Sequence, residues 1–190
     1  MTHTPNPHLD PRSPLVLDTT DLPRRPGAMV AFQREVGAPE GLGLELVGVP
    51  SGAGLSIDLR LESVSEGVLV SGTVSGPVEG ECGRCLRPIS DTIAVSIQEL
   101  YAYPDSATIA MGEDDEVGRV LGELIDLEPV LRDAVVLALP NHPLCRDDCP
   151  GLCPECGVAL DELPADHRHG QVDPRWAMLS QLSQTKTAEE

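Results

Sequence analysis

Apolar and polar residues alternate with a period of two over residues 55–62, where leucine or isoleucine fills every odd position. Such alternation is typical of a β-strand with one buried face. After a Glu-Gly turn, valines on even positions over residues 68–78 predict a second strand, which leads into Cys82-Gly-Arg-Cys85. Residues 93–97 alternate again. Two long strands joined through a cysteine-containing turn indicate an antiparallel sheet or a small barrel.

Shorter extended segments are expected on the N-terminal side of this pair. Apolar runs predict strands at residues 15–17, 29–36 and 42–49. Glycines recur every four residues from residue 72 to residue 80 within the second long strand. Because glycine inside a strand often marks a bulge or a close backbone approach, this spacing predicts bulges or tight curvature there.

Two helices are predicted after the long strands. Apolar residues at positions i, i+3, i+4, i+7, i+8 and i+11 over residues 127–138 predict an amphipathic helix that packs against the sheet. Asp126 can cap this helix, and Pro129 is tolerated in its first turn. The sequence Asp-Pro-Arg-Trp at residues 173–176 predicts the start of a short C-terminal helix. The expected fold class is therefore α+β and mainly β, with a cysteine-rich, zinc-type module and a short C-terminal helix.

The chain divides into four expected parts. Residues 1–13 form a disordered N-terminal tail, and residues 14–140 form the mainly β domain with its packed helix. Residues 141–183 form the cysteine-rich module and the C-terminal helix, and residues 184–190 form a second disordered tail. Within the β domain, residues 103–115 lack periodicity and are rich in acidic side chains, which predicts an exposed loop.

Composition narrows the classes of function. The chain has 190 residues, a formal charge of −18 and only four Phe, Trp or Tyr side chains. Single-stranded nucleic-acid platforms need several aromatic faces, so this class is excluded. An acidic surface favours basic protein partners over nucleic acid. No apolar run is long enough for a membrane span, and the N-terminus lacks a signal-peptide pattern, so we expect a cytoplasmic protein without a membrane partner.

The six cysteines predict a metal site, because thiols in the cytosol stay reduced. Cys82 with Cys85, and Cys153 with Cys156, are Cys-x-x-Cys pairs, in which a tight turn directs both sulfurs at one ion. Spacing alone favours first a structural zinc ion held by these two pairs together. A local site within residues 145–156 comes next, and a site that joins the first pair to Cys145 and Cys149 is a further alternative, so four of the six cysteines are expected to share a metal.

Histidines and redox chemistry provide other interpretations of these cysteines. His142, His167 and His169 can supply nitrogen ligands, although exposed polar positions are the simpler interpretation of the last two. A Cys-x-x-Cys pair can also be a dithiol redox site when it opens a helix. Here the first pair lies between predicted strands, which disfavours that reading. No phosphate-binding loop or nucleophile elbow occurs, so we expect a binding protein without catalytic residues or a small-molecule substrate.

Several motifs together resemble the YceD family, called the large ribosomal RNA subunit accumulation protein. In chain order they lie at residues 17–27, 61–72, 81–86, 98–101, 125–133, 139–140, 144–157 and 173–177. The resemblance implies a ribosome biogenesis factor that promotes maturation or accumulation of large-subunit ribosomal RNA. It carries over no catalytic residue, and the six cysteines carry over only as positions of a cysteine motif.

Possible partners follow from this resemblance and from the charge. They are a large-subunit ribosomal RNA precursor or, preferably, a basic large-subunit ribosomal or assembly protein. If RNA is contacted directly, the candidate residues are Arg24, Arg25, Arg84 and Arg87. Ordinary surface ion pairing is the simpler role for these arginines. The alternative functions are a dithiol redox protein and a zinc-ribbon adaptor unrelated to ribosomes.

Overall fold

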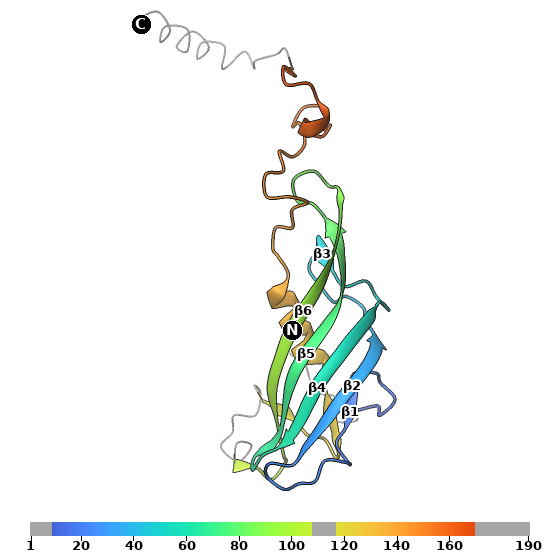
Figure 1. The fold of residues 1–190 in the computed structure, drawn as a ribbon, viewed down its shortest axis with the longest axis vertical. Coiled ribbons are helices and arrows are strands. Elements are labelled where there is room, and N and C mark those ends of the chain that lie inside the picture. Colours follow the sequence, from blue (N-terminus) through green and yellow to red (C-terminus); the bar gives the residue numbers. More distant parts are fainter. Residues whose placement is uncertain (1–8, 108–116, 170–190) are drawn as a thin grey trace, which may run out of the picture. The chain divides into compact units, whose positions relative to one another are not determined.

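The structure, a computed structural model, describes residues 9–107 and 117–169 (Figure 1). Its strands are β1 (Val16–Asp18), β2 (Met29–Gly37), β3 (Val47–Gly48), β4 (Gly54–Ser63), β5 (Gly67–Glu81), β6 (Pro88–Ala102), β7 (Gly118–Arg119) and β8 (Leu124–Asp126). Its helices are α2 (Glu128–Ala138) and the 3-10 helix η1 (Leu160–Glu162). The predicted α+β, mainly β fold is confirmed.

The strands form one large open sheet and one small sheet. The large sheet has the order β2-β4-β5-β6-β7, with β3 paired beside β5, while β1 and β8 form a two-stranded sheet. All pairs are antiparallel except β6–β7, which is parallel. The predicted pair of long strands is the β5–β6 hairpin, which runs in unbroken register from the Gly67–Ala102 pair to the Glu81–Pro88 pair. Of the two expected forms, the sheet is the one observed.

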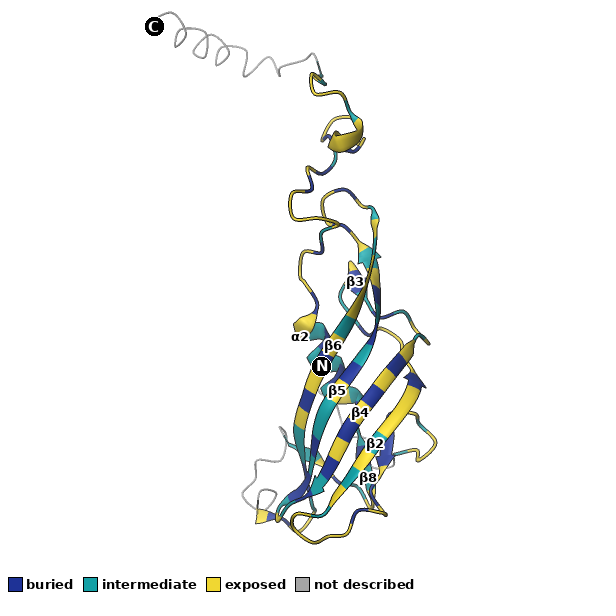
Figure 2. Cartoon of the chain, in the orientation of Figure 1, coloured by how far each residue is buried: buried dark blue, intermediate teal, exposed yellow. Residues whose placement is uncertain are grey.

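One face of the large sheet carries the hydrophobic core. Along β4, buried and exposed residues alternate as the sequence pattern predicts (Figure 2). The buried side chains pack with those of β1, β8 and α2 in one cluster. Helix α2 presents Leu131 and Val135 to this core, and the Asp126 carboxylate accepts a hydrogen bond from the Glu128 N–H at 3.0 Å. The predicted amphipathic helix therefore closes one side of the core.

Two local predictions need correction. The β4–β5 register is continuous across Gly72, so the glycines of β5 form no bulge. Instead they allow close approach, because a Cβ at Gly72 would lie 2.2 Å from the Asp58 carbonyl oxygen. Residues 42–49 form a tight turn with only β3 as strand, since the Val49 N–H bonds back to the Leu42 carbonyl at 2.8 Å.

The chain divides into two compact units, residues 1–147 and residues 148–190. Among the described residues, no helix has the length and apolar character needed to cross a membrane. The helix expected from Asp173 and the tail at 184–190 lie outside the described residues. So do parts of the expected N-terminal tail and of the acidic loop at 103–115.

Candidate metal centres

The first Cys-x-x-Cys pair forms the turn that joins β5 to β6. The Cys82 N–H bonds to the Arg87 carbonyl at 2.8 Å, and the Leu86 N–H bonds to the Cys82 carbonyl at 2.9 Å. Leu86 has a φ of 59°, in the left-handed region. Two hydrogen bonds thus fold the turn so that Cys82 and Cys85 lie on the same side of it.

The second pair forms the same turn. The Cys153 N–H bonds to the Val158 carbonyl at 2.8 Å, and the Gly157 N–H bonds to the Cys153 carbonyl at 2.8 Å. The residue after the second cysteine is again left-handed, with a φ of 72° at Gly157. Both pairs therefore have the backbone that lets a Cys-x-x-Cys turn present two sulfurs to one ion.

The first cluster consists of Cys82, Cys85, Cys145 and Cys149, whose sulfurs lie within 4.8 Å of one another. The Cys85 and Cys145 sulfurs are 3.6 Å apart. Zinc–sulfur bonds of 2.3 Å in a tetrahedron place the sulfurs about 3.8 Å apart, so this spacing suits a four-thiolate ion. The Gly83 N–H holds the turn against the segment before Cys145, through a 2.8 Å bond to the Pro143 carbonyl.

The second cluster consists of Cys153, Cys156, His167 and His169. The Cys153 sulfur lies 3.1 Å from Nε2 of His169, and the Cys156 sulfur lies 3.7 Å from Nε2 of His167. The two Nε2 atoms are 2.8 Å apart. Four ligand atoms of the types that soft or borderline divalent ions prefer thus converge on one point.

Backbone donors favour the thiolate form of one cysteine in each cluster. Burial opposes ionisation of Cys82, but hydrogen bonds from the backbone N–H groups of Cys145, Arg84 and Cys85 lower its pKa to about 6. Backbone N–H groups of Cys156 and Glu155 likewise lower the pKa of Cys153 to about 6, against an opposing effect of burial. Because the thiolate is the metal ligand, both sulfurs are prepared for coordination.

The structure groups the cysteines differently from the pairing that the sequence favoured first. The two Cys-x-x-Cys turns belong to different clusters, and the first turn is grouped with Cys145 and Cys149, as in the third of the predicted alternatives. The four cysteines of residues 145–156 are divided between the two clusters and do not form one group. The physical reason is the path of the chain after α2, which brings residue 143 to the β5–β6 turn through the Gly83–Pro143 bond. No spacing pattern encodes that path.

The histidines also differ from expectation. His167 and His169 are half-buried and face the second pair of cysteines, whereas exposed polar positions were predicted. The missed signal is the presence of two histidines soon after a Cys-x-x-Cys pair, because cysteine and histidine are the ligand types of zinc sites, although the His-x-His spacing is shorter than the usual one. His142 is exposed and belongs to neither cluster among the described residues.

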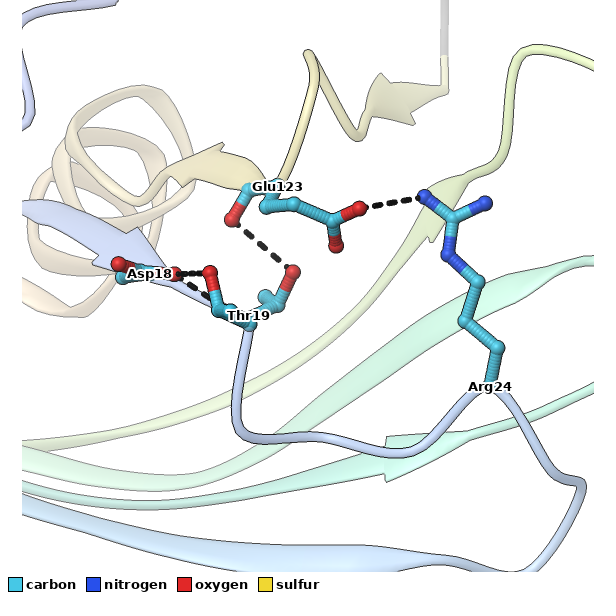
Figure 3. A network of polar contacts seen from close by, with 5 residues as sticks. Asp18, Thr19, Arg24 and Glu123 are labelled. Carbon is cyan, nitrogen blue, oxygen red and sulfur yellow. Dashed lines mark hydrogen bonds and ion pairs between the residues drawn. The ribbon is translucent and has the colours of Figure 1, made fainter.

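Arg24 belongs to a local polar network (Figure 3). Its guanidinium pairs with the Glu123 carboxylate at 3.0 Å and lies over the Tyr103 ring, 4.8 Å from the centroid. The Glu123 carbonyl accepts a hydrogen bond from the Thr19 hydroxyl at 3.0 Å. Arg24 therefore connects the loop after β1 to the turn before β8.

The other candidate arginines are separated along the sheet. Arg25 is exposed beside Arg24, at the end of the sheet where Tyr103 follows β6, and Arg84 and Arg87 lie in the opposite turn. The β5 strand between these ends has 15 residues. At about 3.3 Å per residue, roughly 45 Å separates the two pairs, so they do not form one patch.

Comparison with known proteins places the chain in a family. It is 54% identical over 180 residues to an uncharacterized protein of Mycobacterium tuberculosis, covering 95% of this chain and 86% of that protein. It is 49% identical to an uncharacterized protein of Mycobacterium leprae, and the match covers 90% of this chain and 78% of that relative. It is 28% identical over 124 residues to the uncharacterized protein YlbN of Bacillus subtilis, and the match covers 65% of this chain and 70% of YlbN. No solved structure matches. The sequence model of the large ribosomal RNA subunit accumulation protein YceD matches residues 70–183, which include every residue of both clusters. The chain therefore belongs to the YceD family.

Proposed function

We propose that this protein is a cytoplasmic ribosome-assembly factor that promotes maturation or accumulation of large-subunit ribosomal RNA by binding. The family description implies involvement in the accumulation of that RNA. Binding is supported by the chemistry of the two clusters. Each offers four protein ligands, and a four-coordinate site of that kind leaves no open position for a reacting water.

We propose that the first cluster holds a structural zinc ion. Four thiolates form a soft ligand set that suits zinc, and three of the four cysteines are buried. Such an ion fixes the β5–β6 turn to the segment that follows α2. Dithiol redox chemistry is less well supported, because the first pair joins two strands and opens no helix.

We propose a basic ribosomal or assembly protein as the first contact, with direct RNA contact secondary. The formal charge of −18 favours a basic partner. The separation of the arginine pairs supports this order, because an RNA-binding surface gathers its cations on one face. Arg24 also has the Glu123 carboxylate as its ion-pair partner.

Sedimentation tests the proposed role. Tagged protein is expected to co-sediment with precursor large subunits, and depletion of the protein is expected to lower large-subunit relative to small-subunit ribosomal RNA. A Cys82→Ser/Cys85→Ser variant should lose the association, while Leu137→Ala, which trims an exposed side chain of α2, should keep it. A free protein at the top of the gradient, together with an unchanged RNA ratio after depletion, would contradict the proposal and favour an adaptor unrelated to ribosomes.

A further inference from the structure

We propose that the chain binds a second, independent zinc ion through Cys153, Cys156, His167 and His169, and that this ion folds residues 151–169. This centre goes beyond the ribosomal role and does not depend on it. The ligands come from one short stretch of chain, and neither Cys145 nor Cys149 contributes to it.

The positions of the ligand atoms support an ion. Zinc–sulfur bonds of 2.3 Å and zinc–nitrogen bonds of 2.0–2.1 Å in a tetrahedron place sulfur and nitrogen about 3.6 Å apart and two nitrogens about 3.4 Å apart. The observed distances are 3.1 and 3.7 Å for the two sulfur–nitrogen pairs and 2.8 Å for the nitrogens, so one distance matches the tetrahedral value and the other two are shorter. Each imidazole turns its Nε2 atom toward the other ring and toward a cysteine sulfur. Such an arrangement needs a proton or a cation between the acceptor atoms. Because all four ligand atoms lie close together, we favour the cation.

A carboxylate lies where metal-binding histidines usually have one. Nε2 of His169 faces the cluster, and its other nitrogen, Nδ1, lies 3.7 Å from the Glu155 carboxylate. Histidine ligands of metals generally direct the second ring nitrogen at a carboxylate, carbonyl or water, which fixes the ring and raises its basicity. Glu155 belongs to the Cys-x-x-Cys turn itself, and its backbone N–H bonds to the Cys153 sulfur. Glu155 thus lies near one ligand through its carboxylate and donates a backbone hydrogen bond to another.

Residues 148–169 have very little apolar core. Their buried apolar side chains are Cys149, Cys153 and Ala159, and two of these three are metal-ligand candidates. Val158 and Leu160 are exposed. A segment this short cannot offset its conformational entropy by such burial, so it needs a metal or another crosslink to hold one conformation.

The backbone nevertheless closes on itself around the ligands. The Leu160 N–H bonds to the Gly151 carbonyl at 2.9 Å, and Leu152 forms a bridge with Ala159. After η1, the His167 N–H bonds to the Pro164 carbonyl at 2.9 Å, in a turn that returns both imidazoles to the cysteines. With four protein ligands the site is closed, so the ion acts structurally.

The zinc content of the full chain, purified without chelator, tests the second centre. The wild type is expected to hold two zinc ions. His167→Ala/His169→Ala is expected to hold one, as is Cys82→Ser/Cys85→Ser, while the control His142→Ala keeps two because that exposed histidine lies in neither cluster. A single zinc ion in the wild type that survives the His167→Ala/His169→Ala change would overturn the proposal.

Cobalt substitution identifies each centre even if one variant folds poorly. Sulfur-to-cobalt charge-transfer intensity increases with the number of thiolates, so the His167→Ala/His169→Ala protein should retain a four-thiolate spectrum. The Cys82→Ser/Cys85→Ser protein should retain the weaker spectrum of a site with two thiolates and two imidazoles. Identical spectra from the two variants would contradict two separate centres.

Glu155 gives a finer test. Loss of an outer-shell partner commonly lowers metal affinity by about 10–100-fold, so Glu155→Gln should weaken zinc binding at the second centre by that factor and leave the first unchanged. Glu79→Gln, which neutralises an exposed carboxylate on β5, should change neither affinity. An unchanged second-site affinity in Glu155→Gln would remove the positioning role from this residue.

Discussion

The sheet domain and the cysteine-rich segment are stabilised in different ways. Within the described part of the chain, the buried apolar cluster is drawn entirely from residues 15–139, whereas residues 148–169 bury almost no apolar side chain other than cysteine. The sheet can therefore hold its conformation by burial, and the segment depends on ligand atoms that converge on one point. Where a chain cannot bury apolar surface, coordination replaces it.

The two Cys-x-x-Cys turns extend this comparison to single residues. Both turns share the same pair of backbone hydrogen bonds. In both, the residue directly after the second cysteine has a left-handed backbone. That position is Gly157 in one turn and Leu86 in the other, where the side chain is 57% exposed. The turn in the sheet domain has a leucine in this strained conformation, whereas the turn in the cysteine-rich segment has glycine, which adopts it without strain.

Removal of metal should have the largest effect and should separate the two parts. Binding of a structural zinc ion contributes on the order of 10 kcal/mol in small metal-folded domains, so a strong chelator should unfold residues 151–169. The sheet should keep its structure because its core lies elsewhere. Amide NMR spectra before and after chelation check this, and readdition of zinc is the control. Equal loss of dispersion in both parts would show that the sheet also depends on metal.

A cavity in the core should destabilise the sheet domain and leave the second zinc site unchanged. Leu131 on α2 is 1% exposed, so Leu131→Ala should lower the free energy of unfolding of the sheet domain by about 2–5 kcal/mol. Zinc affinity at Cys153 and its partners should not change. Urea unfolding and zinc competition measure the two effects, with Leu137→Ala, at an 85% exposed position, as the matched control. A parallel loss of zinc affinity would contradict independent stabilisation.

Exchange of the left-handed residues should have a smaller effect. A Cβ at Gly157 meets nothing within 4 Å, so Gly157→Leu is penalised mainly by its φ of 72°, at about 1–2 kcal/mol. The expected result is a zinc affinity at the second centre lower by roughly 5–30-fold, since 1.4 kcal/mol is tenfold. Competition with a chromophoric chelator measures it. Leu86→Gly is the reciprocal change and should not weaken the first centre; a large loss there would assign Leu86 a packing role.

The smallest expected effect concerns pH and the sheet domain alone. Burial, and then repulsion from Asp133, raise the pKa of Glu99. When the pKa of a carboxyl is raised in the folded state, the free energy of unfolding of the protein falls as pH rises through that pKa. The ionised form is therefore the unfavourable one at pH 7. Glu99→Gln should therefore be more stable than the wild type at pH 7. The difference should shrink on acidification, as the wild-type carboxyl protonates.

Urea unfolding at neutral and acidic pH measures the Glu99 effect. Glu45→Gln, at an exposed position, is the control and should show no such pH-dependent gain. An equal gain in Glu99→Gln at both pH values would point to packing of the amide and not to charge.

The local sequence determined the long strands, α2 and both Cys-x-x-Cys turns. Alternation over residues 55–62 and the helical spacing over residues 127–138 are read directly from side-chain periodicity. The turns follow from two cysteines at a fixed short spacing, with hydrogen bonds that close within six residues. The segment at 42–49 was misassigned, because its paired glycines allow a tight fold that apolar content does not reveal.

The tertiary structure alone decided how the ligands are shared. The two Cys-x-x-Cys turns have the same cysteine spacing, so spacing cannot tell which distant cysteines or histidines join each one. The return of the chain after α2 joins the first turn to Cys145 and Cys149, and the turn at Pro164 brings His167 and His169 to the second. Ligand sets form between residues that meet in space, and a linear pattern records only residues that are near in the chain.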